Sequence, residues 1–133
     1  MLRKIKNWFN KNQDDLEGYS RIPDEVEATF SLANDEIPVG ILSCKNGEWY
    51  FKYTEQFKKN SEKYNPIVGF PDIDRVYKSE VLWPFFQVRI PGLKQPQIQE
   101  ILKKEKISSS NEVELLKRFG RKTISNSYQL VAG

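Results

Sequence analysis

Few side chains in this 133-residue sequence are suited to chemistry. The sequence has no histidine, which excludes histidine-based acid–base catalysis, histidine-containing triads and most zinc sites. The single cysteine, Cys44, has Lys45 as its obvious neighbour, and we expect an unreactive thiol. Asp72 and Asp74 in FPDID have the spacing of ordinary turn acids. The residues therefore predict a protein that is not an enzyme and that uses no metal or cofactor.

Basic side chains gather near the C-terminus, at Lys117, Arg118, Arg121 and Lys122. At the C-terminal end of a helix, such charges complement the helix dipole. The alternative is a surface that receives an anionic partner. Lys117, Arg118 and Arg121 are therefore candidate partner-binding residues.

The stretch LWPFFQVRIPG at 82–92 is unusually apolar. At helical spacing, one stripe consists of Leu82, Phe85, Phe86 and Ile90. The apolar surface continues through Val81, Trp83 and Val88. A helix that is apolar nearly all round is central in a core or covered by a partner. We expect the stripe to pack on the core, and we take Trp83, Phe86 and Arg89 as candidate partner anchors because aromatic and arginine residues dominate interfaces.

Alternating apolar residues in 26–32 and 48–57, and a more continuously apolar run at 37–44, predict the sheet that must support this stretch. Three strands are expected, at 26–32 (VEATFSL), 37–44 (IPVGILSC) and 48–57 (EWYFKYTEQF). Asn46-Gly47 suits a type I′ hairpin turn, because both residues tolerate positive φ. The pattern predicts a three-strand antiparallel meander.

Helices are predicted in the second half of the chain. One runs from Ser79 or Glu80 to about Arg89, with Pro84 tolerated only near its first turn. A second spans 95–106. A third follows a capping box in which Ser109 bonds forward and Glu112 bonds back. An edge strand is expected within 122–131. The fold class is α+β, a small antiparallel sheet packed against three to four helices.

The N-terminal region has a different character. Residues 2–12 place Leu2, Ile5, Trp8 and Phe9 at helical spacing, typical of a helix that docks on the domain, on a membrane surface or on a partner. The acidic stretch NQDDLEGYSRIPDE follows as a linker. We expect residues 1–25 to be this helix and linker, and residues 26–133 to form a single domain.

Composition narrows the class of partner and the compartment. The net charge of +3 is mild for a protein that binds nucleic acid through its phosphates. No apolar run is long enough to span a bilayer, and no secretory signal is present. One cysteine favours a reducing compartment. The expected location is the cytoplasm.

An ordered series of motifs resembles the N-terminal subdomain of HipA-type toxin kinases. The motifs are VGIL at 39–42, NGEWYFKY at 46–53, NPIVGFP at 65–71 and PFFQVRIPG at 84–92. ELLKRFGR at 114–121 is similar to a later helix and turn of that subdomain. The resemblance covers roughly residues 27–131. It departs from the family where RIPGL at 89–93 lacks the acidic residue of the usual closing turn.

The resemblance implies a partner. In complete HipA proteins a kinase domain follows this subdomain and supplies the nucleotide loop, the catalytic aspartate and the metal ligands. The 133 residues contain none of these, so the expectation is a free-standing subdomain similar to HipS, which neutralises a separately encoded HipT kinase. We expect a non-enzymatic antitoxin or regulator of a HipA/HipT-type kinase. The alternative is a nucleic-acid-associated accessory module that uses the basic C-terminal cluster.

Overall fold

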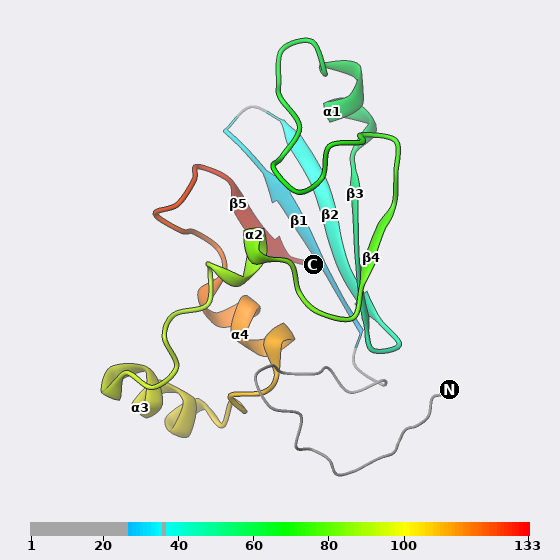
Figure 1. Cartoon of the computed structure of the whole chain (residues 1–133). Helices are drawn as coiled ribbons and strands as arrows, with labels where there is room; N and C mark the ends of the chain where they lie inside the picture. Colours follow the sequence, from blue (N-terminus) through cyan, green and yellow to red (C-terminus); the bar gives the residue numbers. More distant parts are fainter. Residues whose placement is uncertain (1–26, 36) are drawn as a thin grey trace.

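The computed structural model describes residues 27–35 and 37–133 and confirms the α+β class. Within these residues, five antiparallel strands form one sheet in the order β4-β3-β2-β1-β5 (Figure 1). The helix predicted at 2–12 and the acidic linker lie outside the described residues.

The predicted meander is confirmed as β1 (Ala28–Ala33), β2 (Pro38–Lys45) and β3 (Glu48–Tyr53). Asn46 and Gly47 have φ values of 54° and 77°, the positive values that a type I′ turn requires. The resulting register sets Cys44 opposite Trp49 on the neighbouring strand.

The third strand is shorter than the sequence predicts. It was expected to reach residue 57, but a short helix, α1 (Glu55–Lys59), follows it directly. The Thr54 hydroxyl accepts a hydrogen bond from the Phe57 amide at 3.1 Å, which caps this helix. The capping threonine therefore ends the strand that the alternation alone would extend.

The two outer strands differ in how well the sequence predicts them. The expected C-terminal edge strand is confirmed as β5 (Gln129–Ala132), which pairs with β1. At the opposite edge, β4 (Tyr77–Ser79) pairs with β3 and was not predicted. Three residues are too few to display a period of two.

Large aromatic rings fill the covered face of the sheet. Trp49, Phe51 and Tyr53 project from alternate positions of β3, and each is at most 2% exposed. The Phe51 ring lies 4.6 Å from that of Phe70 and 5.7 Å from that of Phe86, measured between centroids. The loop between α1 and β4, which carries Phe70, and the α2 segment, which carries Phe86, therefore close over the sheet through ring contacts.

Two details fix this aromatic layer to the backbone. The buried Tyr53 hydroxyl donates a hydrogen bond to the Phe70 carbonyl oxygen at 2.6 Å and accepts one from the Ile67 amide at 2.9 Å. Burial raises the pKa of Tyr53 to about 12. A Cβ atom on Gly40 would lie 2.5 Å from the Phe51 ring, so glycine lets that ring rest directly on β2.

The helix predicted from Ser79 or Glu80 to Arg89 is much shorter in the structure. It is reduced to α2 (Pro84–Gln87), and Trp83 before it is extended, with φ −67° and ψ 149°. Proline disfavours helical geometry in the residue that precedes it. The Ser79 hydroxyl also accepts a hydrogen bond from the Val81 amide at 3.0 Å, which forms a turn where the helix was expected to begin.

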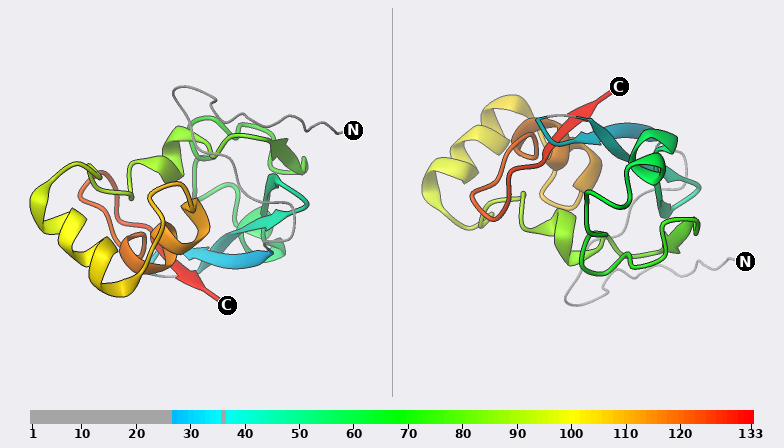
Figure 2. Two further views of the ribbon diagram at one scale, coloured as in Figure 1. Left: turned by 90° about the horizontal axis from the view of Figure 1, so that it is seen from below. Right: turned by 90° about the horizontal axis from the view of Figure 1, so that it is seen from above.

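The last two helices agree with the prediction except at one cap. They are α3 (Pro96–Glu105) and α4 (Glu112–Phe119), and α4 lies between α3 and the sheet (Figure 2). Asn111, and not Ser109, caps α4, because its side chain accepts a hydrogen bond from the Glu114 amide at 3.2 Å. Val113 and Leu116 of α4 pack into the core.

Candidate functional site

The predicted apolar stripe of residues 82–90 does pack on the core. Leu82 and Phe86 are fully buried, and Phe85 and Ile90 pack against the same cluster. Outside this stripe, three apolar residues of 81–90 keep exposed surface: Val81 at 37%, Val88 at 52% and the partly buried Trp83. We call Val81, Trp83 and Val88 the α2 surface.

Trp83 is held at the edge of the core by its neighbours. Its ring packs edge-to-face on Phe70, with centroids 5.2 Å apart. Its carbonyl oxygen accepts a hydrogen bond from the Phe86 amide at 2.9 Å, in the first turn of α2. The packed ring is therefore pre-positioned, which lowers the conformational entropy lost when a partner covers it.

Arg89 is directed into the protein. Arg89 is buried, with 3% of its surface exposed. Nη1 donates hydrogen bonds to the carbonyl oxygens of Gly120 (2.9 Å) and Arg121 (3.2 Å). Nη2 donates to the Asn126 side-chain oxygen (3.2 Å) and the Tyr128 carbonyl oxygen (3.0 Å). Burial lowers the pKa of Arg89, and Nε has no hydrogen-bond partner among the described residues.

This network gives Arg89 a supporting role. It ties the end of the α2 segment to the turn that leads from α4 to β5. Phe86, at 0% exposed, is likewise enclosed. For either residue to reach a partner, its side chain would have to leave the interior. Of the three predicted partner anchors in this segment, Trp83 is therefore the one whose side chain is accessible.

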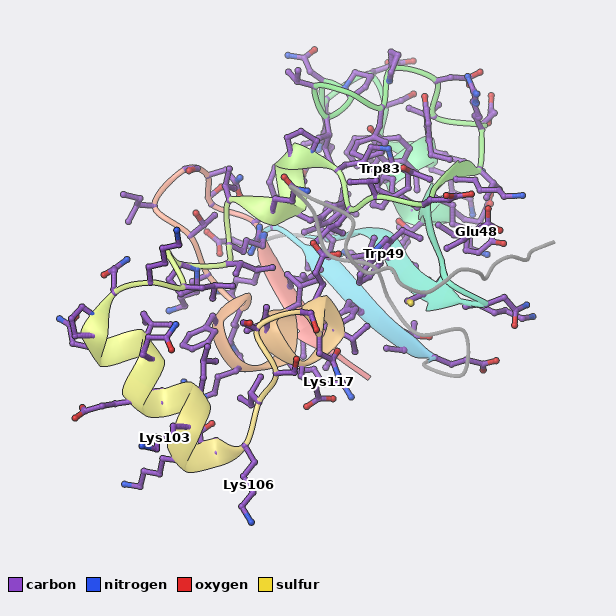
Figure 3. The ribbon with its side chains drawn as sticks, turned by 60° about the horizontal axis from the view of Figure 1, so that its bottom comes forward. Glu48, Trp49, Trp83, Lys103, Lys106 and Lys117 are labelled. Carbon is purple, nitrogen blue, oxygen red and sulfur yellow. The ribbon has the colours of Figure 1, made fainter. Side chains whose placement is uncertain are left out.

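The basic C-terminal residues are exposed but partly neutralised. Lys117 pairs with Glu114 at 3.4 Å, and Arg118 Nε lies 2.9 Å from a carboxylate oxygen of Glu105 on α3. The side chain of Arg121 is exposed, while its carbonyl oxygen accepts the bond from Arg89. Lys117 and Trp83 lie well apart in Figure 3, so the structure does not bring the two predicted groups into one site.

A polar cluster of two buried residues and one partly buried residue beneath the sheet was not predicted as a unit. It comprises Cys44, Trp49 and Glu112, where α4 begins. Burial raises the pKa of Glu112, and the nearby indole N–H of Trp49 partly opposes this shift. The indole N–H makes no hydrogen bond of good geometry to a described residue. Burial, assisted by Glu112 and Glu27, raises the pKa of Cys44 to about 11. A thiol with this pKa is a poor nucleophile near pH 7.

The remaining candidate for chemistry is an ordinary turn. An oxygen of the Asp72 carboxylate accepts a hydrogen bond from the Asp74 amide at 3.0 Å, which is an Asx turn. In residues 27–35 and 37–133, no group of three or more metal-ligating side chains is placed to hold an ion. Nor does this part of the chain contain a helix long and apolar enough to cross a membrane.

Comparison with known families identifies the class of domain. A family model described as the HipA N-terminal domain matches residues 32–125. The chain belongs to this family, which supports a HipA-related toxin–antitoxin context. The matched domain is distinct from the kinase catalytic domain. A comparison with curated proteins found no match.

Proposed function

We propose that this chain is a non-enzymatic, HipS-like antitoxin or regulator that binds and restrains a separately encoded HipA/HipT-type serine/threonine kinase in the cytoplasm. The observation that supports this most is the family match over residues 32–125. In complete HipA proteins the corresponding subdomain precedes the kinase domain. A kinase encoded without that subdomain would offer a complementary surface, and binding would block its active site or hold it in an inactive arrangement.

The α2 surface supports the proposal on the side of this chain. Trp83 is a partly buried, oriented aromatic ring, and Val88, five positions further along the chain, is 52% exposed. Interfaces gain most of their binding energy from a few such anchors that become fully desolvated. We assign Trp83 as the central anchor of the proposed interface, with Val81 and Val88 around it.

The test is co-expression of this chain with a HipA/HipT-type kinase that lacks its own N-terminal subdomain, followed by co-purification and a kinase assay. We expect a stable complex in which phosphorylation of a protein substrate falls. Trp83→Ala should weaken the complex by about 30-fold, the effect of losing roughly 2 kcal/mol at a hot spot. No complex, together with an unchanged kinase rate, would rule the proposal out.

Two controls separate a lost interface from a lost fold. Val88→Glu changes an exposed side chain, so it should leave the unfolding temperature unchanged while it weakens the complex. Ile124→Ala changes a fully exposed apolar side chain outside the α2 surface and should affect neither property. A complex that tolerates Trp83→Ala and Val88→Glu would place the interface elsewhere on the chain.

One observation favours the alternative function, a nucleic-acid-associated module. Residues 93–122 contain eight Lys or Arg and four Asp or Glu, a net charge of +4. Binding to phosphates releases counterions and weakens steeply as salt increases. A gel-shift experiment at low salt with single-stranded and duplex oligonucleotides tests this, and the absence of a shifted band would exclude it.

A further inference from the structure

The α3–α4 pair concentrates the positive charge of the chain. Its net charge of +4 over residues 93–122 exceeds the +3 of the whole sequence. Lys103, Lys104 and Lys106, at the C-terminal end of α3, are exposed, and no ion pair joins them to another described residue. Figure 3 shows Lys103, Lys106 and Lys117 together in the lower part of the view. This face attracts a negatively charged segment.

Two open hollows lie among these charges and share Ile107. One, of about 290 Å³, is lined by Gln99, Leu102, Lys103, Ile107 and Ser109. The other, of about 310 Å³, is lined by Glu105, Ile107, Glu114, Lys117 and Arg118. We call these two hollows the α3–α4 groove. It offers an apolar floor at Ile107 with lysines on either side.

The chemistry of the groove favours a peptide over a phosphate backbone. Glu105 and Glu114 line it but repel any anion alike, so the discriminating feature is Ile107, for which a phosphate backbone offers no apolar side chain. An apolar side chain flanked by carboxylates, in contrast, places its methyl groups over Ile107 and its charges near Lys103 and Lys117. The sequence of this chain contains such a segment at 14–17, Asp-Asp-Leu-Glu.

We propose that this acidic segment of the chain binds the α3–α4 groove, with Leu16 over Ile107 and the acidic side chains directed to Lys103 and Lys117. Residues 12–25 contain five acidic residues and one arginine, a net charge of −4 that matches the +4 of the α3–α4 pair. The proposal goes beyond kinase binding and does not depend on it.

The chain is long enough for this contact within one molecule. The described residues begin at Glu27, and the next residue, Ala28, pairs with Cys44 of β2, whose thiol also feels the charge of Glu112 at the start of α4. From there, the eight residues of α4 extend about 12 Å toward Lys117 and Arg118. The ten Cα-to-Cα steps from Glu17 to Glu27 span up to roughly 33 Å when the chain is extended.

Tethering has a consequence for other ligands. An attached segment acts at a high effective concentration, so a separate anionic ligand must displace it to reach the basic face. The acidic segment would therefore guard this face against non-specific polyanions. Removal of its charges should expose the face.

The test compares amide NMR spectra of the full chain and of the triple variant Asp14→Asn, Asp15→Asn, Glu17→Gln. We expect the amide signals of residues 103–111 and of Lys117 to shift in this variant. Higher salt should move the wild-type signals in the same direction, because it screens the contact. The matched control Asp35→Asn, Glu62→Gln, Glu80→Gln removes the same charge from exposed positions and should leave these signals in place.

Other results would overturn the proposal. Unshifted signals at 103–111 in the triple variant would show that the segment does not bind there. Shifts that disappear on dilution of the wild-type protein would show that a second copy supplies the segment. A second readout is oligonucleotide affinity. The variant Lys103→Gln, Lys117→Gln lacks two charges of the basic face and keeps the acidic segment, so it should bind an oligonucleotide more weakly than the triple acidic variant does. Equal oligonucleotide affinity of the wild type and the triple acidic variant would show that the basic face is not covered.

Discussion

The α2 segment and the α3–α4 pair use arginine in opposite ways. Arg89 is 3% exposed and donates its hydrogen bonds to main-chain and side-chain oxygens between residues 120 and 128. The Arg118 side chain is 41% exposed and pairs with Glu105 across two helices. A buried guanidinium must have its donors satisfied, so it serves the fold, whereas an exposed one stays accessible. An arginine within an apolar stretch is therefore weak evidence for an interface until its burial is known.

The largest expected effect contrasts two side chains of the α2 segment. Phe86→Ala removes a fully buried ring that contacts Phe51 and Phe70, and it should lower the free energy of unfolding by roughly 3–5 kcal/mol. Val88→Ala removes exposed methyl groups and should change this free energy by less than about 0.5 kcal/mol. Urea denaturation measures both values. Similar losses in the two variants would contradict the packing described for α2.

The next effect compares the two arginines directly. Arg89→Ala leaves several buried oxygens without a donor, so we expect a loss of about 3 kcal/mol in the free energy of unfolding. Arg118→Ala breaks an exposed ion pair and should cost less than about 1 kcal/mol. The same denaturation experiment compares them. Hydrogen exchange should also become faster at the amides of residues 121–130 in the Arg89 variant alone.

A smaller effect concerns Glu112 and depends on pH. Burial raises the pKa of Glu112, so the folded protein holds this proton more tightly than the unfolded chain does. Stability from this group is fully present below the ordinary pKa of glutamate and is lost as the pH rises through the folded pKa. Glu112→Gln should therefore raise the unfolding temperature by roughly 2–5 °C near neutral pH. At about pH 4 the difference should disappear, and a stabilisation that persists there would refute this assignment.

The parts of the fold that sequence predicts well are those set by neighbouring residues. Alternation in β1 and β3, the apolar run of β2 and the Asn46-Gly47 turn fix the meander, and all of these signals are local. Pro84 is a local signal too, but the apolar residues of 82–92 favour a longer helix than the structure contains. Apolar composition shows that a segment is buried, and it does not determine whether that segment is helical.

The environment of each candidate site residue depends on long-range contacts. The acceptors of Arg89 lie more than 30 positions away in the sequence, so nothing near residue 89 indicates its burial. Glu112 likewise meets Trp49 because α4 packs beneath the sheet. Trp83 keeps exposed surface, as its position off the apolar stripe indicated. Whether Trp83, Lys117, Arg118 and Arg121 contact a partner stays a prediction.

The most direct test of the central claim is the rate at which a HipA/HipT-type kinase without its own N-terminal subdomain phosphorylates its protein substrate, measured as this chain is added. The proposal predicts that the rate falls and saturates at one chain per kinase, and that Trp83→Ala shifts the curve to about 30-fold higher concentration. A rate that stays constant while the kinase is active and the added chain is folded would contradict it.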